Sequence, residues 1–289
     1  MMHIQPGEVW LVGAGPGDPE LLTRKAERLL REASVVFHDA LVGPDVLALL
    51  PPSTRLVSVG KRSGRHSKDQ RSIDALLVEA ALAGERVVRL KGGDPSIFGR
   101  MTEELTACRV AGIPVHICPG VTAACAAAAT LCQSLTLRGL ARRLTFVTAH
   151  TQSGKPLDLD WQALADPQAT LAIYMGKSSA TEVSRGLIAA GLPPTTPLAL
   201  VENASLPDER RIATRLDLLP IVARALGDGP ALILVGAAME RAPGSDLRGS
   251  TARRQGPEHR DHTQDRHRQH ELGNQADAQG LQDSPGWHR

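Results

Sequence analysis

The chain has 289 residues, of which 42% are hydrophobic, so it can bury one large core or two smaller ones. Its charges nearly cancel, at +2 with neutral histidine, and only 2% of its residues are aromatic, which argues against a nucleic-acid partner. The N-terminus lacks a signal-peptide pattern, and no run approaches the ~18 apolar residues of a membrane span. We therefore expect a cytoplasmic protein without a nucleic-acid or membrane partner.

The first 118 residues alternate short β-rich runs with helical patterns. Strands are predicted at 8–12, 34–38, 55–59, 86–90 and 114–118. Helices are predicted at 19–32, 45–50, 69–83 and 99–111. This alternation is typical of an α/β sheet, and it predicts an N-terminal α/β domain at 8–118.

Pro119-Gly120 interrupts the pattern, so we place a domain boundary there. Helices at 122–131 and 178–190 and strands at 144–148, 170–175, 198–202, 211–215 and 231–235 predict a second α/β domain at 119–240. The segment 241–289 has no Val, Ile, Phe, Tyr, Met, Cys or Lys, and it holds five of the ten histidines. Such a tail cannot bury enough apolar surface to offset its ordering entropy, so we expect it to be disordered, with metal binding by its histidines as the alternative.

The four cysteines are Cys108, Cys118, Cys125 and Cys132, and none of them forms a CxxC pair. A metal site would require closer pairing or neighbouring histidines. We therefore predict no metal site and expect the cysteines to be small apolar core residues in a reducing compartment.

A first glycine-rich segment, VGAGPGDP at 12–19, joins a predicted strand to a helix. Its glycines allow a sharp turn and a close approach of the backbone to a ligand. The GxGxG spacing lacks the third glycine of the dinucleotide fingerprint, and Pro16 interrupts the loop. Asp18 places a carboxylate where a pyrophosphate would lie, which favours a cationic ligand. A plain tight turn is the alternative.

A second glycine-rich segment at 89–100 contains Gly92-Gly93-Asp94-Pro95 and follows another predicted strand. Ligands of open α/β sheets bind at the carboxyl ends of the strands. Two such loops at two strand ends predict a small-molecule cleft, and a structural turn is the alternative.

Three further features lie at the ends of predicted elements. Asp39 follows a strand, where it can cap the next turn or act as a base. The loop 60–68 carries five potentially cationic side chains, which suit a polyanionic substrate or a solvated surface. Thr122 opens a helix after PGV at 119–121, where free N–H groups and its hydroxyl can bind a ligand or cap the helix.

Together and in this order, these features resemble the uroporphyrinogen-III C-methyltransferases, a branch of the tetrapyrrole methylase superfamily. The similarity runs from about residue 8 to residue 239. It rests on VGAGPGDP (12–19), HDALV (38–42), VGKR (59–62), RLKGGDP (89–95), PGVTAA (119–124), YMG (174–176) and ALVENA (199–204).

The resemblance implies a fold of two α/β domains of the tetrapyrrole methylase type, with the active site in the interdomain cleft and a homodimeric assembly. It also implies two methyl transfers from S-adenosyl-L-methionine to uroporphyrinogen III, which give precorrin-2 by way of precorrin-1 and release S-adenosyl-L-homocysteine. Precorrin-2 feeds cobalamin or sirohaem synthesis. The matched positions imply cofactor contacts from Pro16, Gly92, Gly93, Asp94, Ile97, Thr122, Ala123, Met175 and Ala204.

The same resemblance assigns a proton acceptor to Asp39 and a proton donor to Lys61. A carboxylate can stabilise the positive charge that develops on the macrocycle or take up a proton. The substrate has eight carboxylates, which fits the cationic loop. We expect Arg62, Arg65 and, further along the chain, Arg138 to bind these carboxylates.

Three positions depart from the family pattern. Met101 and Leu137 stand where glycine and histidine are usual, and Ser96 stands where phenylalanine is usual. We expect these positions on the substrate side of the cleft, where they affect rate or substrate choice.

Three other functions compete with this prediction. Another precorrin methylase of the same fold is disfavoured by the VGKR and RLKGGDP segments. A nicotinamide-dependent oxidoreductase is disfavoured by Pro16 and the missing third glycine. A catalytically inactive tetrapyrrole-binding protein is disfavoured because Asp39 and Lys61 are present.

Overall fold

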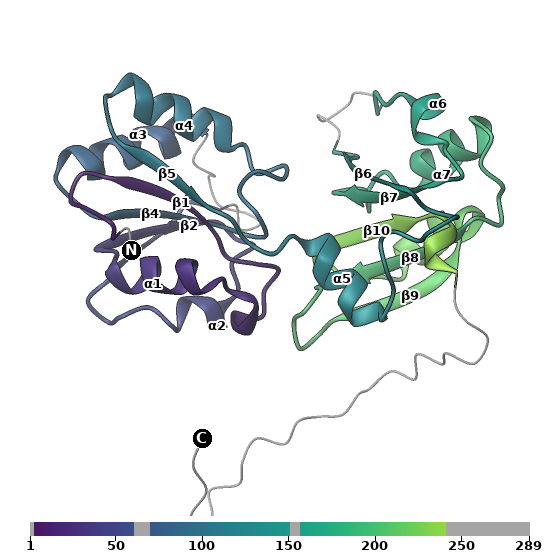
Figure 1. The fold of residues 1–289 in the computed structure, drawn as a ribbon, viewed down its shortest axis with the longest axis horizontal. Coiled ribbons are helices and arrows are strands. Elements are labelled where there is room, and N and C mark those ends of the chain that lie inside the picture. The colour runs from purple at the N-terminus through teal and green to yellow at the C-terminus, as the bar shows by residue number, and fades with distance from the viewer. Residues whose placement is uncertain (1–2, 61–69, 151–156, 241–289) are drawn as a thin grey trace, which may run out of the picture. The chain divides into compact units, whose positions relative to one another are not determined.

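The computed structural model describes residues 3–60, 70–150 and 157–240. The predicted site residues Lys61, Arg62 and Arg65 and the predicted tail at 241–289 lie outside the described residues. The described chain contains two five-stranded sheets with helices packed on them (Figure 1). The predicted α/β class is therefore confirmed.

The first sheet is parallel, in the order β3-β2-β4-β1-β5. Its strands are β1 (Val9–Gly13), β2 (Val35–His38), β3 (Arg55–Ser58), β4 (Val87–Lys91) and β5 (Val115–Cys118). Its helices are α1 (Arg24–Glu32), α2 (Pro44–Leu47), α3 (Gln70–Leu82) and α4 (Met101–Val110), with α1 and α2 on one face and α3 and α4 on the other (Figure 1).

Alternation along β1 shows why both faces are covered. Trp10 and Val12 pack with the residues of α1 and α2, whereas Val9 and Leu11 pack with those of α3 and α4. A parallel strand buried on both faces reads as a continuous apolar run, as β1 does. Because α1 follows β1 and α4 follows the adjacent β4 on opposite faces, the carboxyl ends of these two strands open a crevice.

The predicted single helix at 19–32 is wrong. The segment divides into a 3₁₀ turn, Pro19–Leu21, and α1, which begins at Arg24. Two capping side chains lie five positions apart, and each starts its own element. Asp18 accepts the Glu20 N–H at 2.8 Å, and Thr23, in an extended conformation, accepts the Ala26 N–H at 3.1 Å.

The second sheet has the order β6-β7-β10-β8-β9, with β6 and β7 parallel and the other pairs antiparallel. Its strands are β6 (Arg143–Thr148), β7 (Ala169–Tyr174), β8 (Pro197–Glu202), β9 (Arg210–Arg215) and β10 (Ala231–Val235). The helices of this half are α5 (Ala123–Leu131), α6 (Trp161–Leu164), α7 (Ala180–Ala189) and α8 (Leu219–Arg224). The sequence prediction missed α6 and α8, which are too short to show a helical period.

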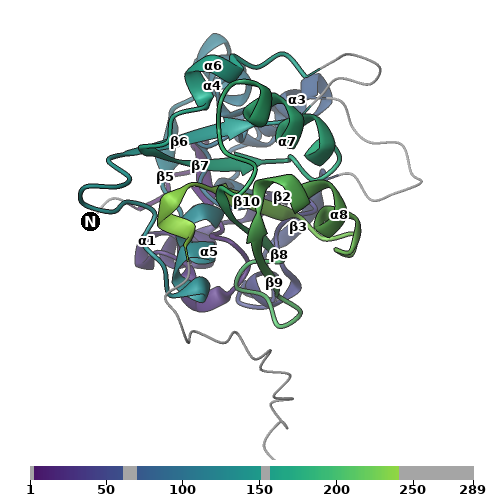
Figure 2. The same cartoon turned by 90° about the vertical axis from the view of Figure 1, so that its right-hand side faces the viewer.

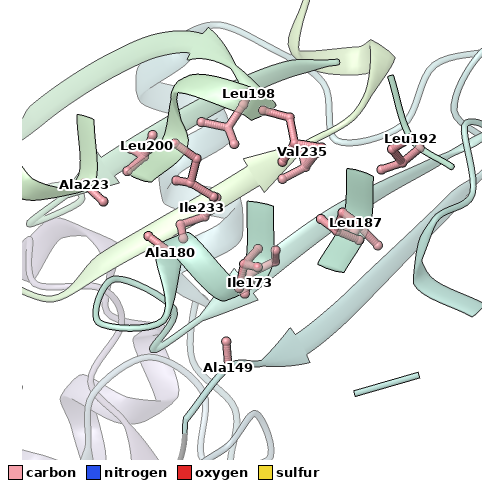
Figure 3. Packing of buried hydrophobic residues seen from close by; sticks show 14 of the residues in the cluster. Ala149, Ile173, Ala180, Leu187, Leu192, Leu198, Leu200, Ala223, Ile233 and Val235 are labelled. Atoms are coloured by element: carbon pink, nitrogen blue, oxygen red, sulfur yellow. The ribbon is translucent and has the colours of Figure 1, made fainter. Parts of the chain in front are cut away.

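Helices α7 and α8 cover one face of the second sheet (Figure 2). Side chains from the strands and helices converge there into one buried cluster (Figure 3). Ile173, Leu200 and Ile233 come from three neighbouring strands, and Leu187 of α7 packs among them. This core holds the ends of β7 and β8 and the start of β10 at one edge of the sheet, because β10 runs antiparallel to both neighbours.

The cysteine prediction is half wrong. Cys108 and Cys118 are buried, and burial raises the pKa of the Cys108 thiol to about 11. Cys125 and Cys132 are exposed, because the buried face of α5 is taken by its alanines and Leu131.

Three other expectations concern the whole chain. The boundary predicted near Pro119 falls between β5 and α5, and residues 3–240 lie within one compact unit. No helix in the described ranges is both long and apolar enough to cross a membrane. The same ranges contain no group of three or more Cys, His, Asp or Glu side chains arranged to hold a metal ion.

Candidate active site

The two glycine-rich segments meet at the carboxyl ends of β1 and β4. Gly93 N–H donates to the Gly15 carbonyl at 2.6 Å, and Gly15 N–H donates back to Gly93 at 3.2 Å. The segment at Pro119-Gly120 meets the same junction. A Cβ on Gly13 would lie 2.6 Å from the Gly120 Cα and 2.7 Å from the Gly93 carbonyl oxygen. Only glycine permits such an approach of three backbones.

A cavity of about 550 Å³ opens at this junction, within the range of small-molecule sites. The nine residues predicted to contact a cofactor all line it, as does Asp39: Pro16, Asp39, Gly92, Gly93, Asp94, Ile97, Thr122, Ala123, Met175 and Ala204. The edge of the second sheet supplies 174–175, 201, 204, 206 and 230–232. The two halves of the described chain therefore contribute to one site.

Asp39 directly follows β2, whose last residue, His38, pairs with Leu90 of β4. Its Oδ1 accepts the Leu41 N–H at 3.0 Å, which caps the next turn. Its Oδ2 lies 3.4 Å from the Gly92 N and 3.8 Å from Nη2 of Arg89. The side chain thus caps the turn, as one alternative predicted, and also presents a carboxylate to the cavity.

Gly60 ends the described chain before the basic loop. A Cβ on Gly60 would lie 2.1 Å from the Ala40 N and 2.7 Å from the Asp39 carbonyl carbon. Glycine is therefore required where the VGKR segment passes the turn that carries Asp39.

Asp94 ties the second glycine loop to the third segment. Its Oδ2 accepts the Gly120 N–H at 2.9 Å, and its Oδ1 accepts the Ser96 N–H at 2.8 Å and also the Ser96 hydroxyl. The departure at Ser96 therefore supplies a hydrogen bond that phenylalanine could not make.

Asp18 has a different role from the one predicted. Its carboxylate caps the turn at Glu20 and does not line the cavity. Its backbone N–H donates to the Ser205 hydroxyl at 3.1 Å, and a Cβ on Gly17 would lie 2.5 Å from Leu206. The first glycine loop therefore packs against the turn that carries Ala204, and of the two glycine-rich segments it is the second, at Asp94, that brings a carboxylate to the cavity wall.

A buried ionic network was not predicted. Glu104 of α4 is fully buried, and its two oxygens accept from Nε of Arg89 at 2.9 Å and Nζ of Lys91 at 2.6 Å. Both cations line the cavity. Burial, followed by repulsion from Arg89, lowers the pKa of Lys91, and Glu104 opposes that shift. The sequence carries one sign of this network: Arg89 and Lys91 are cations at alternate positions of an otherwise apolar strand.

Tyr174 fixes the start of α5. Its hydroxyl lies 2.6 Å from Oγ1 of Thr122 and accepts the Ala124 N–H at 3.3 Å, so Thr122 bonds across the cavity edge rather than capping its own helix. Burial raises the pKa of Tyr174, so the phenol stays protonated at neutral pH. The Tyr174 ring lies 5.1 Å from that of Phe98 and 5.7 Å from that of Phe146.

Left-handed backbone conformations concentrate at this site. Six non-glycine residues of the described chain have positive φ; three of them line the cavity, and two more flank the lining residue Ala204. The three lining residues are Phe98, Arg100 and Met175, and the two flanking ones are Asn203 and Ser205. Each costs on the order of 1 kcal/mol or more, and such strain is concentrated at functional sites.

Arg138 and the three positions that depart from the family pattern do not line the cavity. Arg138 is exposed in the segment between α5 and β6, and the neighbouring Leu137 bridges to Ala141. Met101 packs against the buried cluster between the first sheet and α3 and α4. Of the three departures, only Ser96 bonds to a cavity residue.

The family follows from comparison with known proteins. A family model described as Tetrapyrrole (Corrin/Porphyrin) Methylases matches residues 8–220. The chain belongs to this family. The match includes the motifs from which the resemblance was predicted, so that prediction is confirmed.

Two relatives are named uroporphyrinogen-III C-methyltransferase. The one from Paracoccus denitrificans (strain Pd 1222) is 51% identical over 231 residues, which cover 80% of each chain. The one from Pseudomonas aeruginosa is 48% identical over 80% of this chain and 93% of its own. The siroheme synthase of Gluconacetobacter diazotrophicus is 47% identical, and the match covers 49% of that longer protein.

Solved structures share the fold. Uroporphyrin-III C-methyltransferase from Thermus thermophilus, complexed with S-adenosylhomocysteine, has a TM-score of 0.68 and 41% identity, over 80% of this chain and 98% of that one. A cobalt precorrin-4 methyltransferase has a TM-score of 0.73 and 30% identity, over 81% and 97%.

Proposed function

We propose that this protein is an S-adenosylmethionine-dependent uroporphyrinogen-III C-methyltransferase. It adds two methyl groups in succession and forms precorrin-2, the precursor of cobalamin and sirohaem, by way of precorrin-1. One observation carries the proposal: the residues matched to this branch converge on a single cavity, with Asp39 in its wall. Identity of 51% to a relative of that name supports it.

The cavity fits S-adenosylmethionine. Its glycines leave room for a ligand against the backbone, and a Cβ on Gly92 would already lie 2.8 Å from that of Leu41. The carboxylate of Asp94 suits a cationic ligand, and the apolar side chains of Val201, Ala204 and Leu206 suit a nucleoside. The nine predicted contacts, from Pro16 to Ala204, would hold it. Bound there, S-adenosylmethionine would supply an electrophilic methyl group, and S-adenosylhomocysteine would remain.

The protein's contribution is to hold a pyrrole carbon in line with that methyl group, which replaces a bimolecular encounter by a positioned one. Asp39 would accept the proton that leaves the macrocycle or stabilise the positive charge that develops there. Leu41 N–H and the nearby Gly92 N–H hold its carboxylate in place. Lys61 is the proposed proton donor.

Substrate binding is proposed for Arg62, Arg65 and Arg138, whose guanidinium groups suit the eight carboxylates of uroporphyrinogen III. Replacing Lys61 and Arg62 should raise the substrate KM steeply at fixed ionic strength. An unchanged KM would exclude a substrate-binding role for this loop. We also propose that the protein is cytoplasmic, has no nucleic-acid partner and forms a homodimer. Light scattering of the purified protein tests the dimer.

The decisive experiment is product analysis with S-adenosylmethionine and uroporphyrinogen III. Mass spectrometry should detect a singly methylated and then a doubly methylated product, and Asp39→Ala should form neither at a comparable rate. Turnover of a later corrin intermediate, with none of uroporphyrinogen III, would assign the protein to another precorrin methylase. Binding without turnover would indicate a tetrapyrrole-binding protein.

A further inference from the structure

We infer that Glu104 is a positioning residue for the reaction: it holds Arg89 beside Asp39 at ion-pair distance, without a direct hydrogen bond between the two side chains. The inference rests on the proposed function, because it treats Asp39 as the reactive carboxylate. Glu104 itself does not line the cavity.

Alternation along β4 places the network. Arg89 and Lys91 are two residues apart, so they project from the same face of the strand, the face that α4 covers. Glu104 lies on α4 and is 0% exposed, while the two cationic side chains are 5% exposed. Cations so deeply buried require partners, since an unpaired buried charge is strongly destabilising. One carboxylate serves both.

The geometry separates a strong pair from a weak one. The Glu104–Arg89 contact of 2.9 Å is a charge-assisted hydrogen bond, whereas Oδ2 of Asp39 lies 3.8 Å from Nη2 of the same guanidinium. Nη1 of Arg89 donates to the Leu90 carbonyl at 2.8 Å. Arg89 is therefore held by Glu104 and by the Leu90 carbonyl. From that position it compensates the charge of Asp39 without donating a hydrogen bond to its oxygens.

Charge balance predicts what happens when Glu104 is neutralised. Two cations, Arg89 and Lys91, face two carboxylates, Glu104 and Asp39. In Glu104→Gln, Asp39 is the carboxylate that remains beside Arg89, so the guanidinium should turn toward it. A direct, charge-assisted hydrogen bond from Arg89 would then occupy Oδ2 and make Asp39 a poorer proton acceptor.

The test uses Glu104→Gln, with Glu27→Gln on the surface of α1 as the matched control. We expect kcat to fall about 100-fold, the lower range of what acid–base groups contribute. The KM for uroporphyrinogen III and the calorimetric Kd of S-adenosylhomocysteine should stay within about twofold, because an effect below 0.4 kcal/mol means those contacts are intact. A crystal structure of the variant should show Arg89 bonded directly to Asp39.

A double-mutant cycle isolates the route through Arg89. In an Arg89→Gln background, the further change Glu104→Gln should alter kcat less than about twofold. If Glu104→Gln does not bind S-adenosylhomocysteine, Glu104→Asp takes its place in the cycle; it keeps the charge but shortens the hold on Arg89, so its loss of kcat should be smaller and should again vanish in the Arg89→Gln background. Equal kcat losses in both backgrounds, or an unchanged kcat, would overturn this inference alone. Absence of turnover by the unmutated protein would overturn the proposed function and this inference with it.

Discussion

The two sheets contribute opposite kinds of surface to one cavity. The first half supplies five charged side chains: Asp39, Arg89, Lys91, Asp94 and Arg100. The second half contributes residues that carry no charge at neutral pH in the described chain: Tyr174, Met175, Val201, Ala204, Leu206, Pro230, Ala231 and Leu232. We call these the charged wall and the apolar wall. The charged wall suits proton transfer and carboxylate binding, and the apolar wall suits a nucleoside.

One buried carboxylate supports each wall, but in a different way. Glu104 binds two side chains and so fixes where charge lies. Glu202, which is 1% exposed, pairs with Lys177 at 3.4 Å and Arg210 at 3.5 Å, but its closest contacts are the N–H groups of Gly227 at 2.9 Å and Gly229 at 3.1 Å, so it also fixes the path of a loop. That loop leads into Pro230 and Ala231 of the apolar wall. A buried glutamate thus orients cationic side chains that line the cavity on one side, whereas on the other side it also holds the backbone of a cavity loop.

The largest predicted effect is at the reactive end of the charged wall. Asp39→Asn should lower kcat about 10²- to 10⁴-fold, because an amide cannot accept the proton. The Kd of S-adenosylhomocysteine, measured by calorimetry, should change little if the apolar wall and the glycine loops hold the cofactor. Asp45→Asn, on the exposed surface of α2, is the control. A parallel loss of affinity would mean that the two walls do not divide the work.

The next effect concerns the junction on which both walls depend. Gly13→Ala should lower the free energy of unfolding by about 1–3 kcal/mol, because its Cβ would overlap the backbones at Gly93 and Gly120. S-adenosylhomocysteine binding should weaken with it. Urea unfolding and calorimetry measure the two effects. Gly43→Ala is the control, because its Cβ would find ordinary contacts of 3.4 Å or more. Equal stability of the two variants would contradict the close approach.

Part of this site can be predicted from the sequence, because its residues lie in segments that are consecutive in the chain. Strand, glycine turn and helix follow one another in the chain, so the loops after β1 and β4 were predicted at the correct strand ends. Asp39 was placed for the same reason. The sequence did not reveal that Gly15 and Gly93 pair directly, since that contact joins segments far apart in the chain. It depends on the strand order, which alternation alone does not specify.

The errors have a common physical cause. A charged side chain is ordinarily solvated, so the burial of Glu104 and Arg89 was not expected from the sequence. Their burial requires each other, and a pairing across two elements is a tertiary property. Asp18 was misjudged in the opposite sense, because capping satisfied its carboxylate locally. Local sequence patterns predict where helices and strands begin and end. Which polar side chains face the cavity depends on the charged partners that they find in the folded chain.

Glu202→Gln tests the shape side of the comparison. Burial alone would raise the pKa of Glu202, but the Gly227 N–H and Lys177 outweigh it and hold that pKa below its ordinary value of 4.5. Since the folded-state pKa is depressed, the carboxylate stabilises the fold above pH 4.5, and this contribution is lost as the pH falls through the lowered value. Unfolding by urea should thus show the variant less stable at neutral pH, with the difference shrinking in acid.

Glu79→Gln, on the exposed face of α3, is the control for that titration. The affinity for S-adenosylhomocysteine should fall in Glu202→Gln, while kcat at saturating cofactor should change little. A fall in kcat without a change in affinity would place Glu202 with the charged wall and remove the distinction between the two carboxylates.

The smallest effect lies where the walls touch. Tyr174→Phe keeps the ring but removes the hydroxyl that contacts Thr122 and the Ala124 N–H. The loss should be about 1 kcal/mol in cofactor binding, because each neutral hydrogen bond contributes about that much. Since burial raises the pKa of Tyr174 above its ordinary 10, the loss should be the same at every pH from 6 to 9. Calorimetry with Thr122→Val as the partner of a double-mutant cycle measures the bond itself. A coupling near zero would mean that the ring, rather than the hydroxyl, orders the start of α5.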